Sequence, residues 1–157
     1  MTLTSKFSKT AAILVAAAGL FGANAAFADQ CPAGKTGMDV TKPGPMTPSG
    51  VTDTVISNID LKAYGSAGHQ LRMRRLVVQP GGIVPWHSHQ DRPALIYVME
   101  GTVTEYASNC AVPIVHKTGD ISTETKEVSH WWKNTGKTVA KLLSSDVFHD
   151  QKTASME

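Results

Sequence analysis

The chain contains 157 residues, of which 41% are hydrophobic and 18% charged, with a formal net charge of +2. This length corresponds to one domain, and the composition fits a chain that buries an apolar core rather than a disordered or collagen-like one. Lys6 and Lys9 are the only charged residues among the first 28, so the rest of the chain has equal numbers of acidic and basic residues. A neutral domain does not favour binding to nucleic acid or to an anionic membrane.

Residues 1–28 have the three-part pattern of a secretory signal peptide. A weakly basic start precedes an apolar run, residues 11–20, and residues 26–28 form a small-x-small sequence. Such a pattern predicts cleavage after Ala28 and a periplasmic or secreted protein with no membrane association after cleavage. The alternative is an uncleaved membrane anchor, for which the apolar run is short.

Export affects the interpretation of Cys31 and Cys110, the two cysteines of the chain. Two thiols in an oxidising compartment more often pair than stay free, so we expect a disulfide between them. This bridge would tie down residues 29–54, whose Gly- and Pro-rich composition predicts an extended N-terminal arm rather than a helix or a central strand. Two unpaired thiols are the alternative, because the sequence does not give the distance between the two Cα atoms.

Residues 55–149 consist of short apolar runs separated by turn residues, and residues 150–157 form a C-terminal tail. Many short strands at this spacing predict a β-sandwich or β-barrel. The region has no sustained apolar period of a helix, so we expect little helix. The predicted strands are Val55–Leu61, Leu71–Gln79, Val84–His89, Ala94–Glu100, Thr102–Ala107, Val112–His116, Ile121–Thr123, Val128–Asn134 and Ala140–Val147.

The histidine pair His87 and His89 lies in one of these predicted strands. Side chains alternate along a strand, so both imidazoles project from the same face, about 7 Å apart along the strand. Two such rings can hold one metal ion at about 2.0–2.1 Å from each nitrogen. A third histidine, His130, lies in a second stretch, residues 119–134.

The two stretches together resemble the paired motifs of the cupin superfamily. The first motif reads Gly, five residues, His-x-His, three or four residues, Glu, six residues, Gly; the second reads Gly, five residues, Pro-x-Gly, two residues, His, three residues, Asn. The matching residues are Gly81, His87, His89, Gly101, Gly119, His130 and Asn134. The resemblance implies an all-β, jelly-roll-like double-stranded β-helix barrel over residues 55–149, with one divalent transition metal on the three histidines.

The chain departs from these motifs at the carboxylate position, which is Ala94, and at the Pro and Gly of the second motif, which are Thr125 and Glu127. Some cupin dioxygenases also use three histidines without the carboxylate, so the resemblance implies a metal with positions open for water or substrate. Residues that could replace the carboxylate from elsewhere are Gln90, Asp91 and Glu105. Imidazole ligands leave the metal open among Fe, Zn, Cu, Mn and Ni; loading outside the cytoplasm favours Cu or Zn, and resemblance to dioxygenases favours Fe.

Strand alternation predicts a mostly apolar pocket beside the histidines. Ala94, Ile96 and Val98 share one face of their strand, and Trp132 shares a face with the third histidine. Arg74 on a preceding strand would bind a carboxylate through two hydrogen bonds if it faces inward. The alternatives are plain core packing for the tryptophan and a solvated basic edge for the arginine.

These features predict an exported metal-dependent enzyme acting on a small organic molecule, with dioxygenase-type chemistry favoured by the resemblance. The alternative is a non-catalytic protein that binds a small ligand or the metal itself. Ala94 supports this alternative, because it removes the carboxylate most often placed to act as a general base. Single-domain cupins commonly pair, so the resemblance also implies a homodimer.

Overall fold

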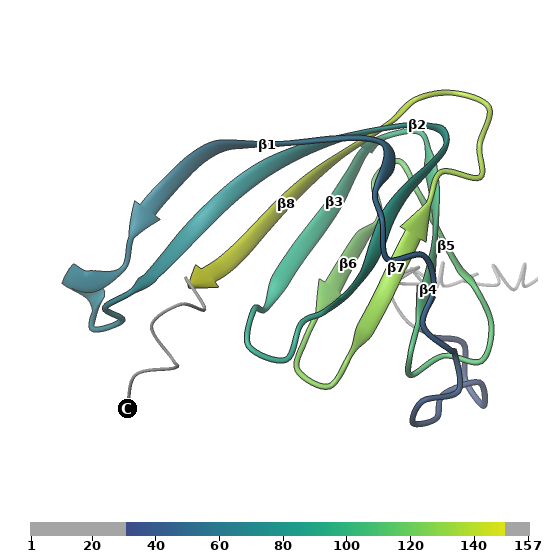
Figure 1. The fold of residues 1–157 in the computed structure, drawn as a ribbon, viewed down its shortest axis with the longest axis horizontal. Coiled ribbons are helices and arrows are strands. Elements are labelled where there is room, and N and C mark those ends of the chain that lie inside the picture. Colours follow the sequence, from purple (N-terminus) through teal and green to yellow (C-terminus); the bar gives the residue numbers. More distant parts are fainter. Residues whose placement is uncertain (1–30, 150–157) are drawn as a thin grey trace, which may run out of the picture.

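The structure, a computed structural model, describes residues 31–149; the expected signal peptide and C-terminal tail lie outside the described residues. Within this range, one 3-10 turn, Lys62–Tyr64, accompanies the strands, and no helix has the length and apolar character that a membrane crossing requires. The strands are β1 (Ser49–Asp60), β2 (His69–Ser88), β3 (Ala94–Glu100), β4 (Thr102–Ala107), β5 (Ile114–Lys117), β6 (Ile121–Glu124), β7 (Ser129–Lys133) and β8 (Ala140–His149), as drawn in Figure 1.

The strands form one antiparallel sheet in the order β5-β4-β7-β2-β8-β3-β6, with β1 paired to the side of β2. This sheet curls on itself (Figure 1), and the turn between β5 and β6 comes back to β3. There Gly119 N donates to Val98 O at 2.9 Å, and Val98 N donates to Asp120 O at 3.0 Å. The barrel is therefore nearly closed, and the predicted all-β, jelly-roll-like fold is confirmed.

The sequence predicts two separate strands, Leu71–Gln79 and Val84–His89, joined by a turn at residues 80–82. The structure has one continuous strand here, β2. It runs without a break for 20 residues, pairing with β1 and β8 in its first part and with β7 from Ile83 to Ser88. Gly81 has a φ of 76°, a conformation that glycine adopts without steric penalty, so the strand bends here and continues. The bend leads the chain from β8 toward β7 and brings the histidine pair opposite β7.

The N-terminal arm is shorter than predicted, because β1 begins at Ser49 and not at Val55. Residues 49–54 already pair with β2, even though Gly50 lies among them, and the φ of 58° at this glycine sits beside a register shift. Residues 31–48 keep the extended, turn-rich course that their composition predicts. The predicted disulfide between Cys31 and Cys110 is confirmed, with a Cα–Cα distance of 5.4 Å, and it fixes the arm to the barrel.

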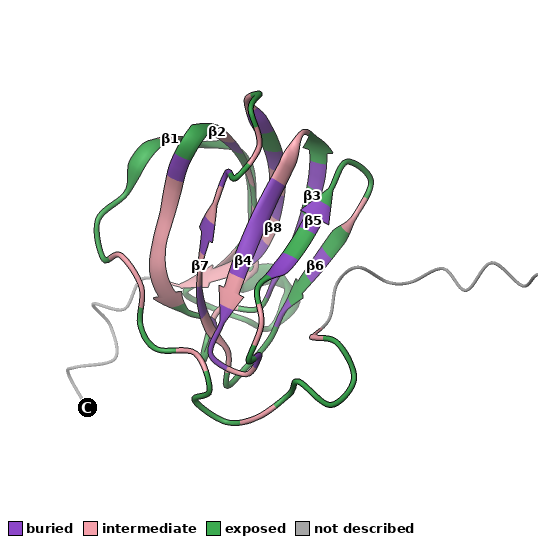
Figure 2. Ribbon diagram, turned by 90° about the vertical axis from the view of Figure 1, so that its right-hand side faces the viewer, coloured by how far each residue is buried: buried purple, intermediate pink, exposed green. Residues whose placement is uncertain are grey.

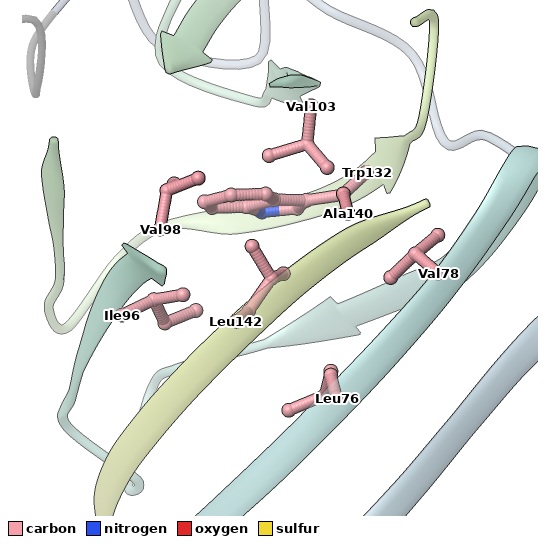
Figure 3. Packing of buried hydrophobic residues seen from close by; sticks show 8 residues of the cluster. All are labelled: Leu76, Val78, Ile96, Val98, Val103, Trp132, Ala140 and Leu142. Carbon is pink, nitrogen blue, oxygen red and sulfur yellow. The ribbon is translucent and has the colours of Figure 1, made fainter. Parts of the chain in front are cut away.

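The apolar core surrounds the indole of Trp132, which is 2% exposed. Figure 3 shows Val103 and Leu142 on opposite faces of the ring. The buried cluster consists of Leu76, Val78, Ile96, Val98, Val103, Trp132, Ala140 and Leu142. Along β3, buried and exposed residues alternate as predicted (Figure 2), which is why one face of this strand supplies the core.

Polar side chains are also buried inside the barrel, and several of them are ionisable. The fully or nearly fully buried ones include His89, Thr104, Glu105, His116, Ser122, Glu124, His130, Asn134, Ser144 and Asp146. Buried carboxylates are rare unless they are paired. This concentration of partnered polar groups marks the functional part of the interior.

Candidate metal centre

The three motif histidines converge from two strands that are far apart in sequence. His87 on β2 lies directly opposite His130 on β7 in the strand register, and His89 follows one residue beyond the end of β2. Residues directly opposite on adjacent antiparallel strands have neighbouring side chains. The bend in β2 therefore brings the three rings together, because it places His87 opposite β7.

The Nε2 atoms of the three rings face a common point. They are separated by 3.1 Å between His87 and His89, 3.0 Å between His89 and His130, and 3.3 Å between His130 and His87. Three imidazole nitrogens at about 2.0–2.1 Å from one ion would be about 2.9 Å apart at right angles and about 3.4 Å apart at tetrahedral angles. The observed separations lie within this range, so the geometry fits a metal held on one face.

The opposite nitrogen of each ring, Nδ1, has an oxygen partner. The partners are the Pro85 carbonyl for His87 (2.8 Å), the Arg92 carbonyl for His89 (2.8 Å) and the Glu105 carboxylate for His130 (2.6 Å). Carbonyl and carboxylate oxygens accept hydrogen bonds, so each Nδ1 carries a hydrogen, and a ring without a second proton directs an Nε2 lone pair at the other two. Lone pairs that face one another are stabilised by a cation between them, and this donor set therefore fits a metal.

The surroundings of His87 and His89 also favour the neutral form of both rings. Burial, together with the charge of His130, lowers the pKa of His87 to about 3 and that of His89 to about 4. Burial also opposes a charge on His130, but the hydrogen bond with Glu105 and the charge of Glu124 outweigh it and raise its pKa. At neutral pH, two of the three rings are thus ready to bind a cation, and the third exchanges a proton for it.

Glu105 orients two histidines from the side away from the Nε2 cluster. Its Oε1 accepts from His130 and its Oε2 from His116 Nε2 at 2.8 Å. Burial raises the pKa of Glu105, but the bonds to His116 and His130 outweigh it and lower the pKa to about 2. The ring of His116 stacks on Trp132, with centroids 4.7 Å apart. Glu105 therefore lies on the Nδ1 side and holds His130 in place, and it does not reach the Nε2 side where the motif carboxylate would act as a fourth ligand.

A second buried carboxyl, Glu124, was not anticipated from the sequence. The sheet register pairs Glu124 on β6 with Ala94 on β3, so the glutamate lies next to the position where the motif carboxylate is missing. Its Oε2 is 3.2 Å from His130 Nδ1, and it accepts a hydrogen bond from Ser122. Burial raises the pKa of Glu124 to about 7. Only the pairing of β3 with β6 shows that Glu124 lies here, and the alternation of residues within one strand does not reveal which strands pair.

A cavity of about 230 Å³ opens beside His87 and His89. Its lining consists of Asp53, Arg74, Leu76, Val84, Pro85, His87, His89, Arg92, Ile96, Trp132, Leu142 and Ser144. Arg74, Ile96 and Trp132, which the sequence analysis assigns to a substrate pocket, are among these lining residues. Val98 differs from the prediction: it packs in the apolar cluster beside Trp132 (Figure 3) and does not reach the cavity. Ala94 differs as well, because its sheet neighbours Glu124 and Asp146 place it at a separate hollow.

Arginines from β2 and the following turn gather beside this cavity. The bidentate pair that the sequence suggests for Arg74 forms at Arg72, whose Nε and Nη2 donate to Asp146 at 3.1 and 2.8 Å. Arg74 pairs instead with Asp53 on β1. Register explains the difference, because Arg72 lies opposite Asp146 on β8. Arg92, which sequence reasoning did not select, also lines the cavity.

The fold and the paired motifs define a cupin, and comparison with known proteins agrees. The family model described as a cupin domain matches residues 74–146, and together with the fold it identifies the barrel as a single cupin domain. No curated protein sequence matches the chain.

Several solved structures share the fold. A predicted oxalate decarboxylase from Thermotoga maritima is 19% identical, with a TM-score of 0.52, 69% of this chain and 97% of that chain covered. An RmlC-like cupin from Shewanella frigidimarina is 16% identical, with a TM-score of 0.50 and coverages of 72% and 88%. The Cnp3 cupin domain of Schizosaccharomyces pombe is 10% identical, with a TM-score of 0.51 and coverages of 69% and 67%. At these identities the likeness shows the fold, and function has to be argued from the site.

Proposed function

We propose that this protein is an exported cupin that binds one divalent transition metal on His87, His89 and His130 and acts as a metal-dependent enzyme on a small organic molecule. The observation that carries this proposal is the set of three Nε2 atoms facing one point while every Nδ1 has an oxygen partner. Such outer partners fix the orientation of metal-binding histidines. Dioxygenase-type chemistry is the favoured subclass, because three-histidine sites without the carboxylate resemble that group.

The residues around the histidines have separable tasks in this proposal. Three protein ligands leave coordination positions free on the cavity side, where a bound metal would serve as a Lewis acid or activate dioxygen. Glu105 keeps His130 in the tautomer that exposes Nε2. The apolar walls exclude water and strengthen electrostatic interactions inside. The volume of about 230 Å³ restricts the site to small molecules.

A non-catalytic ligand-binding protein is the second candidate, and one observation favours it. Among the described residues that line the cavity, Asp53 is the only acidic one, and it is engaged by Arg74. A general base therefore has to come from the metal-bound solvent or from the substrate itself. A screen for metal-dependent oxygen consumption with small organic molecules distinguishes the two: stabilisation of the protein by a ligand without any product supports the binding protein.

Elemental analysis of protein purified from its own compartment tests the metal site. We expect about one equivalent of a transition metal in the wild type and its loss in His130→Ala, because two imidazoles alone bind a metal far more weakly. His69→Ala, at the start of β2 and outside the site, is the matched control and should keep the metal. Absence of metal from both wild type and control would end the metalloenzyme proposal.

The element found directs the next assay. Iron would support the proposal of a dioxygenase. Zinc, copper, manganese or nickel would instead call for assays of lyase, hydrolytic or metal-handling activity. Export is tested separately by N-terminal sequencing of the mature protein. We expect it to begin at Asp29, and a sequence that begins at Met1 would contradict cleavage of a signal peptide.

A further inference from the structure

Three arginines lie in or beside the wall of the metal cavity, and only two aspartates accompany them. Asp146 is buried and receives two hydrogen bonds from Arg72. Asp53 is engaged by Arg74. Both carboxylates therefore have an arginine of their own, and a third arginine, Arg92, stands beside them.

Arg92 lacks a comparable partner among the described residues. Its side chain is 25% exposed, and its Nε lies 3.6 Å from Asp146 Oδ2, which is too long for a hydrogen bond. This Nε is buried and has no hydrogen-bond partner in the described part of the protein. Such a group gains from any anion that reaches it.

The position of Arg92 directs that anion into the metal cavity. Arg92 lines the cavity together with His87 and His89, and its carbonyl oxygen accepts the hydrogen of His89 Nδ1 at 2.8 Å. The backbone of this arginine is thus fixed to a metal-site histidine. The rest of the lining includes apolar side chains, Ile96 and Leu142 among them.

We infer that the ligand of this cavity is a small molecule with one carboxylate, which Arg92 binds through its guanidinium while the apolar part of the ligand packs between Arg92 and the histidines. Three arginines and two aspartates leave one positive charge, which matches a monoanion better than a phosphate dianion. The planar guanidinium fork suits a carboxylate, to which it donates two parallel hydrogen bonds. That this ligand is the substrate rests on the proposed function; the anion site itself does not.

Paired probes of equal shape test the carboxylate requirement. Butyrate and benzoate are titrated into the full mature protein beside butyramide and benzamide, with inorganic phosphate as a further probe, by calorimetry and thermal shift. We expect each carboxylate to bind about tenfold or more tightly than its amide, because hydrogen bonds between charged partners are the stronger ones. Equal binding of acid and amide, tighter binding of phosphate, or no binding of any probe would overturn the inference.

Variants test the assignment to Arg92. Arg92→Gln should weaken carboxylate binding about tenfold or more and leave amide binding unchanged, and Arg92→Lys, which keeps the charge but loses the fork, should lie between. Arg75→Gln is the matched control, because Arg75 is exposed on the opposite face of the same strand as Arg74 and should bind as the wild type does. Wild-type affinity in both Arg92 variants would refute the assignment.

Metal content measured on the same samples separates this inference from the proposed function. Binding of carboxylate that depends on Arg92 in protein without metal would support the anion site and count against the metalloenzyme. One equivalent of metal with no preference for acid over amide would support the metal site and overturn the anion site.

Discussion

The two parts of the barrel interior are held together by different physics. Around Trp132, apolar side chains pack on one another, and any side chain of suitable size and shape would serve. Around His130, buried histidines and carboxylates pair with specific partners, because an unpaired polar atom there would lose its hydrogen bonds to water. The apolar part therefore stabilises the fold, and the polar part has its geometry fixed by a few named contacts.

Trp132 joins the two parts. One face of its indole stacks on His116 at an interplanar angle of 11°, and its edge meets His130 with ring centroids 5.8 Å apart. Packing in the apolar part thus limits the positions of the histidines that Glu105 holds. The orientation of His116 and His130 therefore depends on contact with Trp132 as well as on hydrogen bonds to Glu105.

The largest expected effect separates stability from metal binding. Leu142 is 1% exposed and belongs to the apolar cluster, so Leu142→Ala should lower the free energy of unfolding by about 2–5 kcal/mol. The three histidines come from β2, its end and β7, and their Nδ1 hydrogen bonds do not involve Leu142 on β8, so the folded variant should keep one equivalent of metal. Denaturant unfolding and elemental analysis measure the two properties on one preparation.

The neighbour Leu143 provides the matched control, because it faces the other side of β8 and is only partly buried. Leu143→Ala should cost less of the free energy of unfolding than Leu142→Ala does. Loss of metal from a folded Leu142→Ala protein would show that the two parts of the interior are not separable.

A smaller effect is expected in the polar part. Glu105→Gln removes the charged acceptor that serves His130 and His116, and replacement of such outer partners lowers metal affinity about 10- to 100-fold. Competition with a chelator of known affinity measures this change. Glu100→Gln, an exposed glutamate paired with Lys141, is the control and should leave metal affinity unchanged. Equal affinity in Glu105→Gln and wild type would mean that Glu105 does not support the metal site.

Features that depend on one strand were predictable from the sequence. Alternation along β3 predicted which of its residues are buried, and the resemblance to the cupin motifs selected His87, His89 and His130, which the structure brings together. The strand order and the bend of β2 at Gly81 were not predictable from periodicity. A Pro-Gly-Gly sequence between two apolar runs is typical of a turn, and only pairing with β7 and β8 on the two sides of the bend keeps it in one strand.

Features that depend on two strands escaped prediction. Glu124 lies by the three histidines because it is opposite Ala94, and Arg72 binds Asp146 because those two residues are opposite each other. Register between strands distant in sequence is set by the closing of the whole barrel, which local patterns do not report. Arg92 lies in a turn after β2, where no periodicity exists to assign it an inward side.

The last prediction uses pH to distinguish two groups inside the polar part, on protein freed of metal. The pKa of His87 is lowered to about 3 from an ordinary value of 6.5, so between these values the unfolded chain binds a proton that the folded protein does not. The contribution of His87 to stability therefore falls as the pH falls below 6.5, by at most about 1.4 kcal/mol per unit. The pKa of Glu124 is raised to about 7 from 4.5, so its contribution is present below pH 4.5 and is lost as the pH rises through 7.

Urea unfolding of the wild type, His87→Gln and Glu124→Gln between pH 4.5 and 6.5 measures both contributions. The difference in unfolding free energy between wild type and His87→Gln should become less favourable to the wild type as the pH falls, and the difference between wild type and Glu124→Gln should change in the opposite direction. The opposite signs make each variant the control of the other, since a general effect of pH on the barrel would move both differences together. If both differences changed in the same direction, burial would not determine the charge of these two groups. The polar and apolar parts of the interior would then differ only in how their side chains pack.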